Sequence, residues 1–289
     1  MKTNFQKYYP IFFIAVLIAV NIFIWSVVLR SEKTKELIVA FLDVGAGDSI
    51  YIEAPNGNKM LIDGGPDRSV VRELSEIIPF YERTIDVVLA THPDKDHIGG
   101  LIDVLKNYET KMILTTGATS TTETDKAFGK AIFDEEKMGA KNILVRRGSV
   151  VNLSEDVLFT VLYPVAIHPK EPTNDTSIVG MLTYGNQSFL LTGDAPQKVE
   201  RYLVSVDGKK LKAQVLKIGH HGSKTSSSEV FIGNVSPDYA IISTAKKNRY
   251  GHPNKEVINL LKKYNIPTLA TYDSGKIIFK TDGEILTHN

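Results

Sequence analysis

The chain of 289 residues contains no cysteine. This absence excludes disulfide bonds and thiolate ligands, so a metal ion would have to be held by histidine, aspartate or glutamate. The chain also lacks an excess of charge of one sign, since 34 Lys and Arg residues face 33 Asp and Glu residues. There is therefore no overall basic field of the kind that alone indicates nucleic-acid binding, and a polyanionic substrate would have to be held by local charge.

Long hydrophobic runs are scarce, and the one that stands out lies near the N-terminus. Ile11 to Leu29 is interrupted only by Asn21 and Ser26, and as a helix it would reach about 28 Å, against about 30 Å for a hydrocarbon core. It is longer than the apolar part of a usual signal peptide, and no small-residue cleavage site follows before Arg30. We therefore expect residues 1–36 to form a single-pass membrane anchor with a polar juncture, Ser31 to Glu36.

The orientation of this anchor is weakly encoded. Lys2 and Lys7 precede the apolar run, whereas Arg30, Lys33 and Lys35 come after it, so the count of basic residues alone slightly disfavours export of the C-terminal part of the chain. A lone N-terminal span nevertheless commonly acts as a signal anchor. We therefore expect residues 37–289 to be extracytoplasmic.

A β-hairpin is the first feature after the juncture. Leu37 to Leu42 and Ser49 to Ala54 are apolar runs, and Asn56-Gly57 separates the second of them from Lys59 to Ile62. Because both turn residues tolerate positive φ, this pattern predicts antiparallel strands at the start of the domain.

Strand-like and helix-like segments then alternate along the chain. The expected helices are Arg68 to Ile78, Ile98 to Asn107, Thr124 to Met138, Ala195 to Leu203 and Asn254 to Tyr264. The expected strands are Asp86 to Ala90, Met112 to Leu114, Asn142 to Val145, Leu158 to Leu162, Ile178 to Thr183, Phe189 to Leu191, Val215 to Ile218 and Tyr239 to Ile242, with a last hairpin from Lys276 to Phe279 and Glu284 to Leu286. No low-complexity linker separates the two halves. This order predicts one α/β domain, residues 37–289, built as a four-layer αββα sandwich.

The residues that indicate chemistry come directly after the strand expected at Asp86 to Ala90. His92, Asp94, Asp96 and His97 lie within six residues on a strand-to-helix loop. Imidazole and carboxylate are the ligands that zinc accepts when thiolate is absent, and the added carboxylates also suit manganese. Helix capping would explain one of the acids but not the flanking histidines, so we predict a site for one or two divalent ions, zinc or manganese.

This loop, HPDKDHIGG, resembles the signature HxHxDH of the metallo-β-lactamase superfamily, with Asp94 in place of the second histidine. That replacement is typical of the C-terminal hydrolase domain of ComEC-type DNA-uptake (competence) proteins. Further stretches resemble the same family in order and spacing: FLDVGAGDSIYIEAPNG at 41–57, LIDGG at 61–65, NDTS at 174–177, LLTGD at 190–194 and KIGHHGSKTSSS at 217–228.

The resemblance implies a set of ligands. His92 and Asp94 would bind a first metal ion, and Asp96 and His97 a second. Asp194 would bridge both ions. A water between the ions would be acidified and act as the nucleophile, with Asp96 as the partner for its proton.

One of the adjacent residues His220 and His221 is expected to complete the cluster. Neighbours on a straight strand point to opposite sides, which argues against both binding the same ion. We take His220 as the ligand and His221 as a proton donor or substrate contact, with the reverse left open. By resemblance to the phosphodiesterase branch, His252 would assist proton transfer, although alone it would be read as a surface histidine.

Four further residues are candidates for supporting roles. Asp63 would accept a hydrogen bond from a ligand imidazole, or else serve only as a turn residue. Ser223 and Lys224 begin a hydroxyl-rich run that could grip a phosphate, or simply cap the next helix. Asp175, with Asn174 beside it, stands where the family carries a further histidine. His168 and His288 have no companions at ligand spacing, and we expect both at the surface.

The sequence also departs from the family pattern. Ala46 replaces the glutamine of the opening motif DVGQGDS, which removes an amide near the site. The missing histidine near Asp175 predicts a weaker first metal site, and therefore a mononuclear or manganese-preferring centre. The polytopic channel and the oligonucleotide-binding barrel of a full ComEC-type protein are not found in this chain.

These observations favour a membrane-anchored phosphodiesterase or nuclease acting on DNA or RNA, supplied by a separate DNA-uptake channel. Basic clusters at 146–147, 209–212 and 246–249 could follow a phosphate backbone or could simply be solvated. Two other functions stay open. The site could hydrolyse a lactone or β-lactam, or the protein could be a metal-containing scaffold of an uptake apparatus.

Overall fold

The computed structural model describes residues 5–30, 36–168 and 170–289, and the chain forms two compact units, 1–35 and 36–289. The first unit contains helix α1 (Phe5–Arg30). Its segment Tyr8–Trp25 has a mean hydropathy of 2.1 and is wholly exposed, so by length and composition it is able to cross a membrane. The predicted juncture lies outside the described residues except for Glu36, as do Lys2, Lys33 and Lys35 of the orientation argument.

The second unit contains two β-sheets, one of eight strands and one of seven within the described residues. The first has the order β15-β14-β1-β2-β3-β4-β5-β6 and the second β13-β12-β11-β10-β9-β8-β7. The first comprises β1 (Leu37–Phe41), β2 (Ile50–Glu53), β3 (Lys59–Ile62), β4 (Thr84–Leu89), β5 (Glu109–Thr115), β6 (Lys141–Leu144), β14 (Ile277–Thr281) and β15 (Leu286–His288). The second comprises β7 (Val150–Asn152), β8 (Val157–Tyr163), β9 (Val179–Tyr184), β10 (Gln187–Leu191), β11 (Val215–Lys217), β12 (Tyr239–Ile242) and β13 (Thr268–Ala270).

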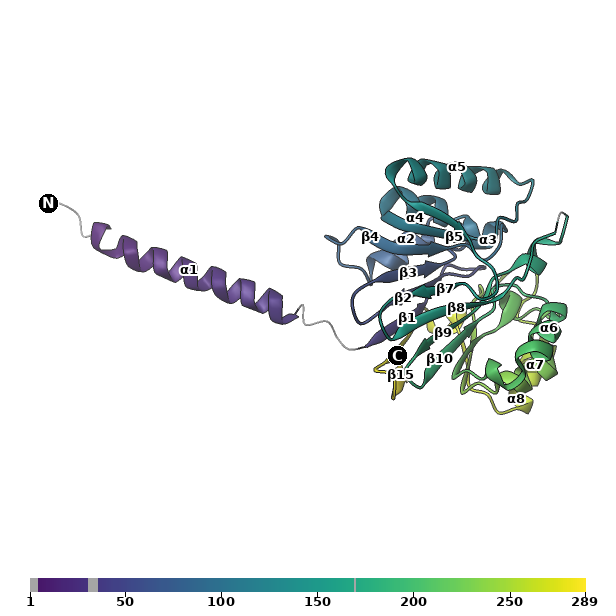
Figure 1. Ribbon diagram of the computed structural model, residues 1–289. Helices are drawn as coiled ribbons and strands as arrows, with labels where there is room; N and C mark the ends of the chain where they lie inside the picture. The colour runs from purple at the N-terminus through teal and green to yellow at the C-terminus, as the bar shows by residue number, and fades with distance from the viewer. Residues whose placement is uncertain (1–4, 31–35, 169) are drawn as a thin grey trace. The chain divides into compact units, whose positions relative to one another are not determined.

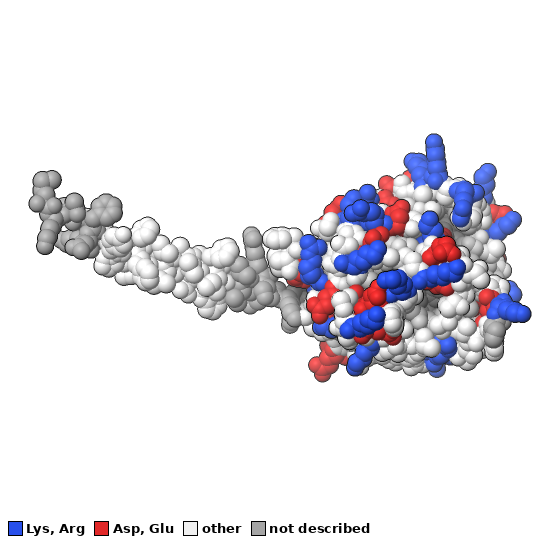
Figure 2. All heavy atoms as spheres, turned by 90° about the horizontal axis from the view of Figure 1, so that it is seen from above, with Lys and Arg blue, Asp and Glu red and all other residues white. Residues whose placement is uncertain are grey.

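Helices cover the outer face of each sheet (Figure 1). The first sheet carries α2 (Ser69–Ser75), α3 (Lys95–Ile98), α4 (Leu101–Asn107) and α5 (Glu123–Met138), and the second carries α6 (Gln197–Asp207), α7 (Glu229–Val235) and α8 (Lys255–Lys263). The short helices α9 (Thr271–Ser274), η1 (Thr173–Thr176), η2 (Gly208–Leu211) and η3 (Gly219–Gly222) lie in connections. The face that Figure 2 shows carries intermixed basic and acidic side chains, as the balanced composition predicts.

Three apolar clusters explain this layering. The central one joins the inner faces of the two sheets, where Phe41, Phe159, Phe189 and Phe279 are buried. A second cluster packs α2, α4 and α5 on the first sheet, and a third packs α6, α7 and α8 on the second. Two sheets that each bury both faces require four layers, so the predicted αββα sandwich is confirmed.

The hairpin at Asn56-Gly57 is confirmed, since β2 and β3 pair antiparallel across it. The single helix expected from Ile98 to Asn107 is wrong, because α3 ends at Ile98 and α4 begins at Leu101. The reason is a close approach of two backbones. The Gly64 N–H donates to the carbonyl of His97 at 2.7 Å, and a Cβ on Gly100 would lie 2.0 Å from the carbonyl oxygen of Gly64.

Candidate metal centre

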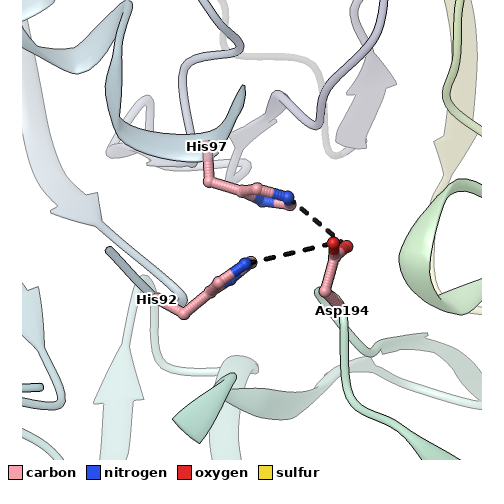
Figure 3. A group of neighbouring side chains, drawn as sticks. All are labelled: His92, His97 and Asp194. Carbon is pink, nitrogen blue, oxygen red and sulfur yellow. Dashed lines mark ion pairs between the residues drawn. The ribbon is translucent and has the colours of Figure 1, made fainter. Parts of the chain in front are cut away.

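The predicted site residues gather where strands of both sheets end. His92 to His97 follow β4, Asp194 follows β10, and His220 and His221 follow β11. Figure 3 shows His92 and His97 from the first half of the domain pointing toward Asp194 from the second half. The two sheets therefore each supply part of a single cluster.

Asp194 lies at the centre of this cluster. Its Oδ1 is 3.3 Å from His97 Nε2, and its Oδ2 is 4.0 Å from His92 Nε2. The same Oδ2 lies 3.7 Å from His220 Nε2 and 3.6 Å from His221 Nε2. One carboxylate thus faces four imidazoles, which is the arrangement expected of a ligand that bridges two ions.

Asp94 and Asp96 form the open side of the cluster. Asp94 Oδ2 lies 3.7 Å from His92 Nε2, and Asp96 Oδ2 lies 3.5 Å from His221 Nε2. Their side chains are 35% and 28% exposed, whereas the rings of His92 and His97 are fully buried. Solvent or a substrate therefore reaches the cluster past these two carboxylates.

The ring of His97 is held from behind by Asp63. Asp63 Oδ2 lies 2.8 Å from His97 Nδ1, and the Asp63 carboxylate also accepts hydrogen bonds from the backbone N–H and the hydroxyl of Thr91. This contact leaves Nε2 of His97 directed at Asp194, and it fits the outer-partner role predicted for Asp63 rather than a turn residue alone.

The two adjacent histidines do not lie on a strand. β11 ends at Lys217, and His220 and His221 both have a left-handed backbone, with φ of 49° and 54°. Such a conformation is costly outside glycine and is found where the surroundings enforce it. The alternation argument therefore does not apply, and both rings approach Asp194.

His221 is the more deeply held of the pair. It is 3% exposed, whereas the side chain of His220 is 27% exposed. Its Nδ1 lies 2.9 Å from the carbonyl oxygen of Ser243 and 3.3 Å from Asp48 Oδ1. Asp48 Oδ2 in turn forms an ion pair of 2.7 Å with Lys217 Nζ, and both of these residues are buried. A buried ion pair thus lies directly behind His221.

The pKa values show how strongly these groups interact. Burial would lower the pKa of His97, but Asp194 and Asp63 outweigh it, so the pKa lies well above its usual value. Burial opposes the shift of His221 too, yet Asp194 and Asp48 raise its pKa to about 10. The same histidines hold the pKa of Asp194 well below the usual range despite its burial. The carboxylates therefore favour the charged forms of His97 and His221, whereas burial and the neighbouring His97 lower the pKa of His92.

These residues fit a divalent ion. His92 Nε2, His97 Nε2, His221 Nε2 and Asp194 Oδ1 are buried and, within the described residues, have no hydrogen-bond partner. Buried polar atoms are almost always paired, so these four demand an occupant. Four sets of three residues have ligand atoms within 4.8 Å of one another: His92, His97 and Asp194; Asp96, His97 and His221; Asp48, Asp194 and His221; and Asp48, Asp63 and His97. Imidazole and carboxylate together suit zinc or manganese.

The remaining predicted residues are less central. The Asp175 carboxylate forms an ion pair with Lys198 on α6, so it is engaged away from the cluster, whereas Asn174 Nδ2 lies 3.4 Å from His220 Nδ1. Ser223 is buried and its hydroxyl pairs with Thr225 at 3.0 Å. Lys224 is exposed.

His252 lies beside the cluster. Its ring centroid is 5.4 Å from that of His220. Burial and the neighbouring His220 lower its pKa, so its imidazole is neutral near pH 7. His168 and His288 are both exposed, as predicted.

The three basic clusters differ in their relation to the site. Arg147 is engaged by Asp207 through two hydrogen bonds of 2.6 and 2.8 Å. In the 209–212 cluster, the carbonyl of Lys212 accepts a hydrogen bond of 3.4 Å from Ser188 Oγ at the start of β10. The metal centre lies at the other end of this strand, where Asp194 follows it. The 246–249 cluster lies in the loop that also carries His252. The 246–249 cluster is therefore close to a predicted site residue in the chain.

Sequence reasoning gave no role to Asp48, Lys217 or Thr91. The first two lie inside stretches that carry the family resemblance, at 41–57 and 217–228. A lysine at the end of an apolar strand run was a signal of a buried, paired cation, because lysine is rarely buried without a partner. Its partner could not be identified without the fold.

The fold and the site define a metallo-hydrolase type of protein. A family model described as the metallo-beta-lactamase superfamily matches residues 42–246. The chain therefore belongs to the metallo-β-lactamase superfamily.

Curated relatives narrow this to a competence-related branch. The chain is 35% identical to ComE operon protein 3 of Bacillus subtilis over 86% of its own length and 34% of that protein. It is 32% identical to competence protein ComA of Neisseria gonorrhoeae, over 84% of this chain and 32% of that protein. It is 31% identical to recombination protein 2 of Haemophilus influenzae, over 82% and 28%. The chain thus spans about a third of the length of these relatives.

Solved structures share the fold at low identity. Igni18, a metallo hydrolase from the archaeon Ignicoccus hospitalis, superimposes with a TM-score of 0.55 at 10% identity over 84% of this chain and 98% of its own. Zn²⁺-bound PqqB from Methylobacterium extorquens gives 0.51 at 11% identity over 78% and 85%. These likenesses concern the fold alone.

Proposed function

We propose that the chain is a membrane-anchored, metal-dependent phosphodiesterase that cleaves DNA or RNA. The observation that carries this proposal is a cluster of three imidazole Nε2 atoms and one carboxylate oxygen from both halves of the domain, all buried and without a hydrogen-bond partner among the described residues. The competence-related relatives support a nucleic acid as the substrate.

We assign His92 and Asp94 to one ion, Asp96 and His97 to a second, and Asp194 to both. Between the two adjacent histidines we assign His221 as the ligand. Its burial, its contact with Asp96 and the support behind its Nδ1 favour this choice over the half-exposed His220. The roles first expected for His220 and His221 are thereby exchanged.

When bound, a divalent ion at such a site supplies an acidified water and takes up negative charge from the phosphoryl oxygen. The chain's own residues orient the reaction. Asp63 fixes the ring of His97 through Nδ1, and Asp48 and the Ser243 carbonyl fix that of His221. Asp96, partly exposed, faces the water and its proton.

The rings of His220 and His252 lie next to each other at the edge of the cluster, where we place the departure of the leaving group. Neutral His252 can exchange a proton there, and His220 is oriented through its Nδ1, which lies 3.0 Å from Thr225 Oγ1 and 3.4 Å from Asn174 Nδ2. Lys224 and Ser223 come directly after in the chain, and we assign them contacts with a substrate phosphate. Asp175 pairs with Lys198 away from the cluster and has no role in this proposal.

We further propose that α1 anchors the chain with residues 36–289 outside the cytoplasm, and that a separate channel supplies the DNA. The length and hydropathy of α1 support the anchor. Fusing alkaline phosphatase or green fluorescent protein to the end of the chain tests the orientation, because phosphatase activity requires export. Fluorescence without phosphatase activity would reverse the proposed topology.

Incubating the full chain in detergent micelles with single-stranded DNA, duplex DNA and RNA tests the activity. Manganese or zinc is added, a chelator removes either ion, and nitrocefin and a lactone serve as carbonyl substrates. We expect metal-dependent cleavage of nucleic acid that is lost in the Asp96→Ala/His97→Ala variant. Hydrolysis only of the carbonyl substrates would favour a lactonase or β-lactamase, and absence of bound metal would favour a scaffold.

A further inference from the structure

A row of aromatic rings leads from the metal centre to the surface. The rings of His221 and His220 lie 6.1 Å apart, and those of His220 and His252 lie 5.4 Å apart. Tyr250 continues the row, stacked at 20° on His252 with 5.7 Å between centroids. The guanidinium of Arg249 lies 4.5 Å from the centroid of the Tyr250 ring. The row thus ends in a flat aromatic and cationic surface.

This end of the row is accessible. Tyr250 is 51% exposed, and Lys246, Lys247 and Arg249 are exposed in the same loop. The composition of this loop, cations beside an aromatic ring, is the one that single-stranded nucleic acids bind.

The loop is held in shape rather than free. The side chain of Asn248 donates to the carbonyls of Ala245 and His252, at 2.9 and 2.6 Å. Its Oδ1 accepts from the backbone N–H groups of Tyr250 and His252, at 3.2 and 3.0 Å. One asparagine therefore fixes the backbone of the loop that carries Tyr250, so that little ordering of this backbone is needed on binding.

We propose that Tyr250 and Arg249 form a stacking site for a nucleobase close to the phosphodiester that is cleaved. The inference rests on the proposed function and names its substrate class, a nucleic acid with an unpaired base. A base in a duplex is stacked on its neighbours and presents no free face, whereas a single strand offers one at each nucleotide. The site therefore selects single strands over duplexes.

Binding is measured on the full chain in lipid nanodiscs, with a chelator present so that no cleavage occurs. The probes are a fluorescein-labelled single-stranded oligodeoxynucleotide and the same backbone with abasic sites. We expect Tyr250→Ala to weaken binding of the normal strand about tenfold, since stacking on an aromatic side chain is worth that much per base. Binding of the abasic strand should change little, and Tyr250→Phe should keep the wild-type affinity.

Tyr81→Ala is the matched control, because Tyr81 is 72% exposed in the segment before β4, away from the carboxyl ends that carry the site. A second readout is 2-aminopurine in the strand, whose fluorescence falls on stacking. Equal weakening of normal and abasic strands by Tyr250→Ala, or no weakening, would overturn the stacking site while leaving the nuclease proposal intact. Failure of the wild-type chain to bind either strand would overturn both proposals.

Discussion

The first sheet supplies its ligands within six consecutive residues, His92 to His97, whereas the second supplies Asp194 and His221 from two separate loops. The supports differ as well. His97 is held by the Asp63 carboxylate, which Thr91 orients with two neutral donors. His221 is held by a backbone carbonyl and a buried ion pair. Both sides place a carboxylate behind an imidazole, but only the second adds a buried cation, so the two sides should respond differently to substitution and to pH.

Removing the cation behind His221 should have the largest effect. In Lys217→Ala the carboxylate of Asp48 stays buried without its partner, and breaking such a pair costs about 3–5 kcal/mol. Thermal unfolding in detergent micelles measures this loss. The double variant Asp48→Asn/Lys217→Met removes both charges and should recover most of the stability. If single and double variants are equally unstable, charge is not what holds the second side.

The same pair makes the second side sensitive to acid. Burial would raise the pKa of Asp48, but Lys217 and His221 outweigh burial and hold the pKa below its usual value. Its contribution to stability is therefore complete above the ordinary carboxyl pKa of about 4 and is lost as the pH falls through the lower, folded value. Wild type should thus lose stability in acid relative to Asp48→Asn/Lys217→Met, which has no charged pair to titrate, so that the two stability curves diverge. Parallel curves would contradict the charge-based support.

Replacing each of the two adjacent histidines with alanine compares the proposed ligand His221 with its neighbour His220. We expect His221→Ala to weaken zinc binding more than about 100-fold, because losing only an outer partner already costs about 10- to 100-fold. His220→Ala should weaken it much less. Isothermal titration of the chelator-treated protein measures both affinities. A larger loss in His220→Ala would restore the opposite assignment.

On the first side, Asp63→Ala should weaken zinc binding about 10- to 100-fold by freeing the ring of His97. Thr91→Val should cost less, about 1 kcal/mol of stability for each hydrogen bond lost, since its hydroxyl donates to Asp63 and lies 3.0 Å from His92 Nδ1. Titration and thermal unfolding measure the two effects. On the second side no side-chain hydroxyl has the part that Thr91 plays, because the group beside His221 Nδ1 is the backbone carbonyl of Ser243. A Thr91→Val effect as large as that of Asp63→Ala would show that Thr91 itself holds the centre.

The same contrast explains what the sequence could predict. The loop from His92 to His97 was found because its ligands are adjacent and follow an apolar strand. The directions of His220 and His221 were not, because two successive left-handed residues break the rule of alternation that a strand would obey. The pairing of Asp48 with Lys217 joins distant parts of the chain, and nothing local to either residue identifies the other. The break at Gly99-Gly100 depends on contact with Gly64, which likewise lies outside the helix pattern.

The order of the strands has a consequence for biosynthesis. β1 pairs with β14, so the first strand of the domain cannot complete its pairing until one of the last strands has been synthesised. The acid-rich loop at 92–97 likewise precedes Asp194 and His221 by about a hundred residues of synthesis. If the cluster binds a divalent ion as proposed, the ligands from the two halves can meet only after residue 221 has been synthesised, so tight binding has to wait until most of the domain has been made.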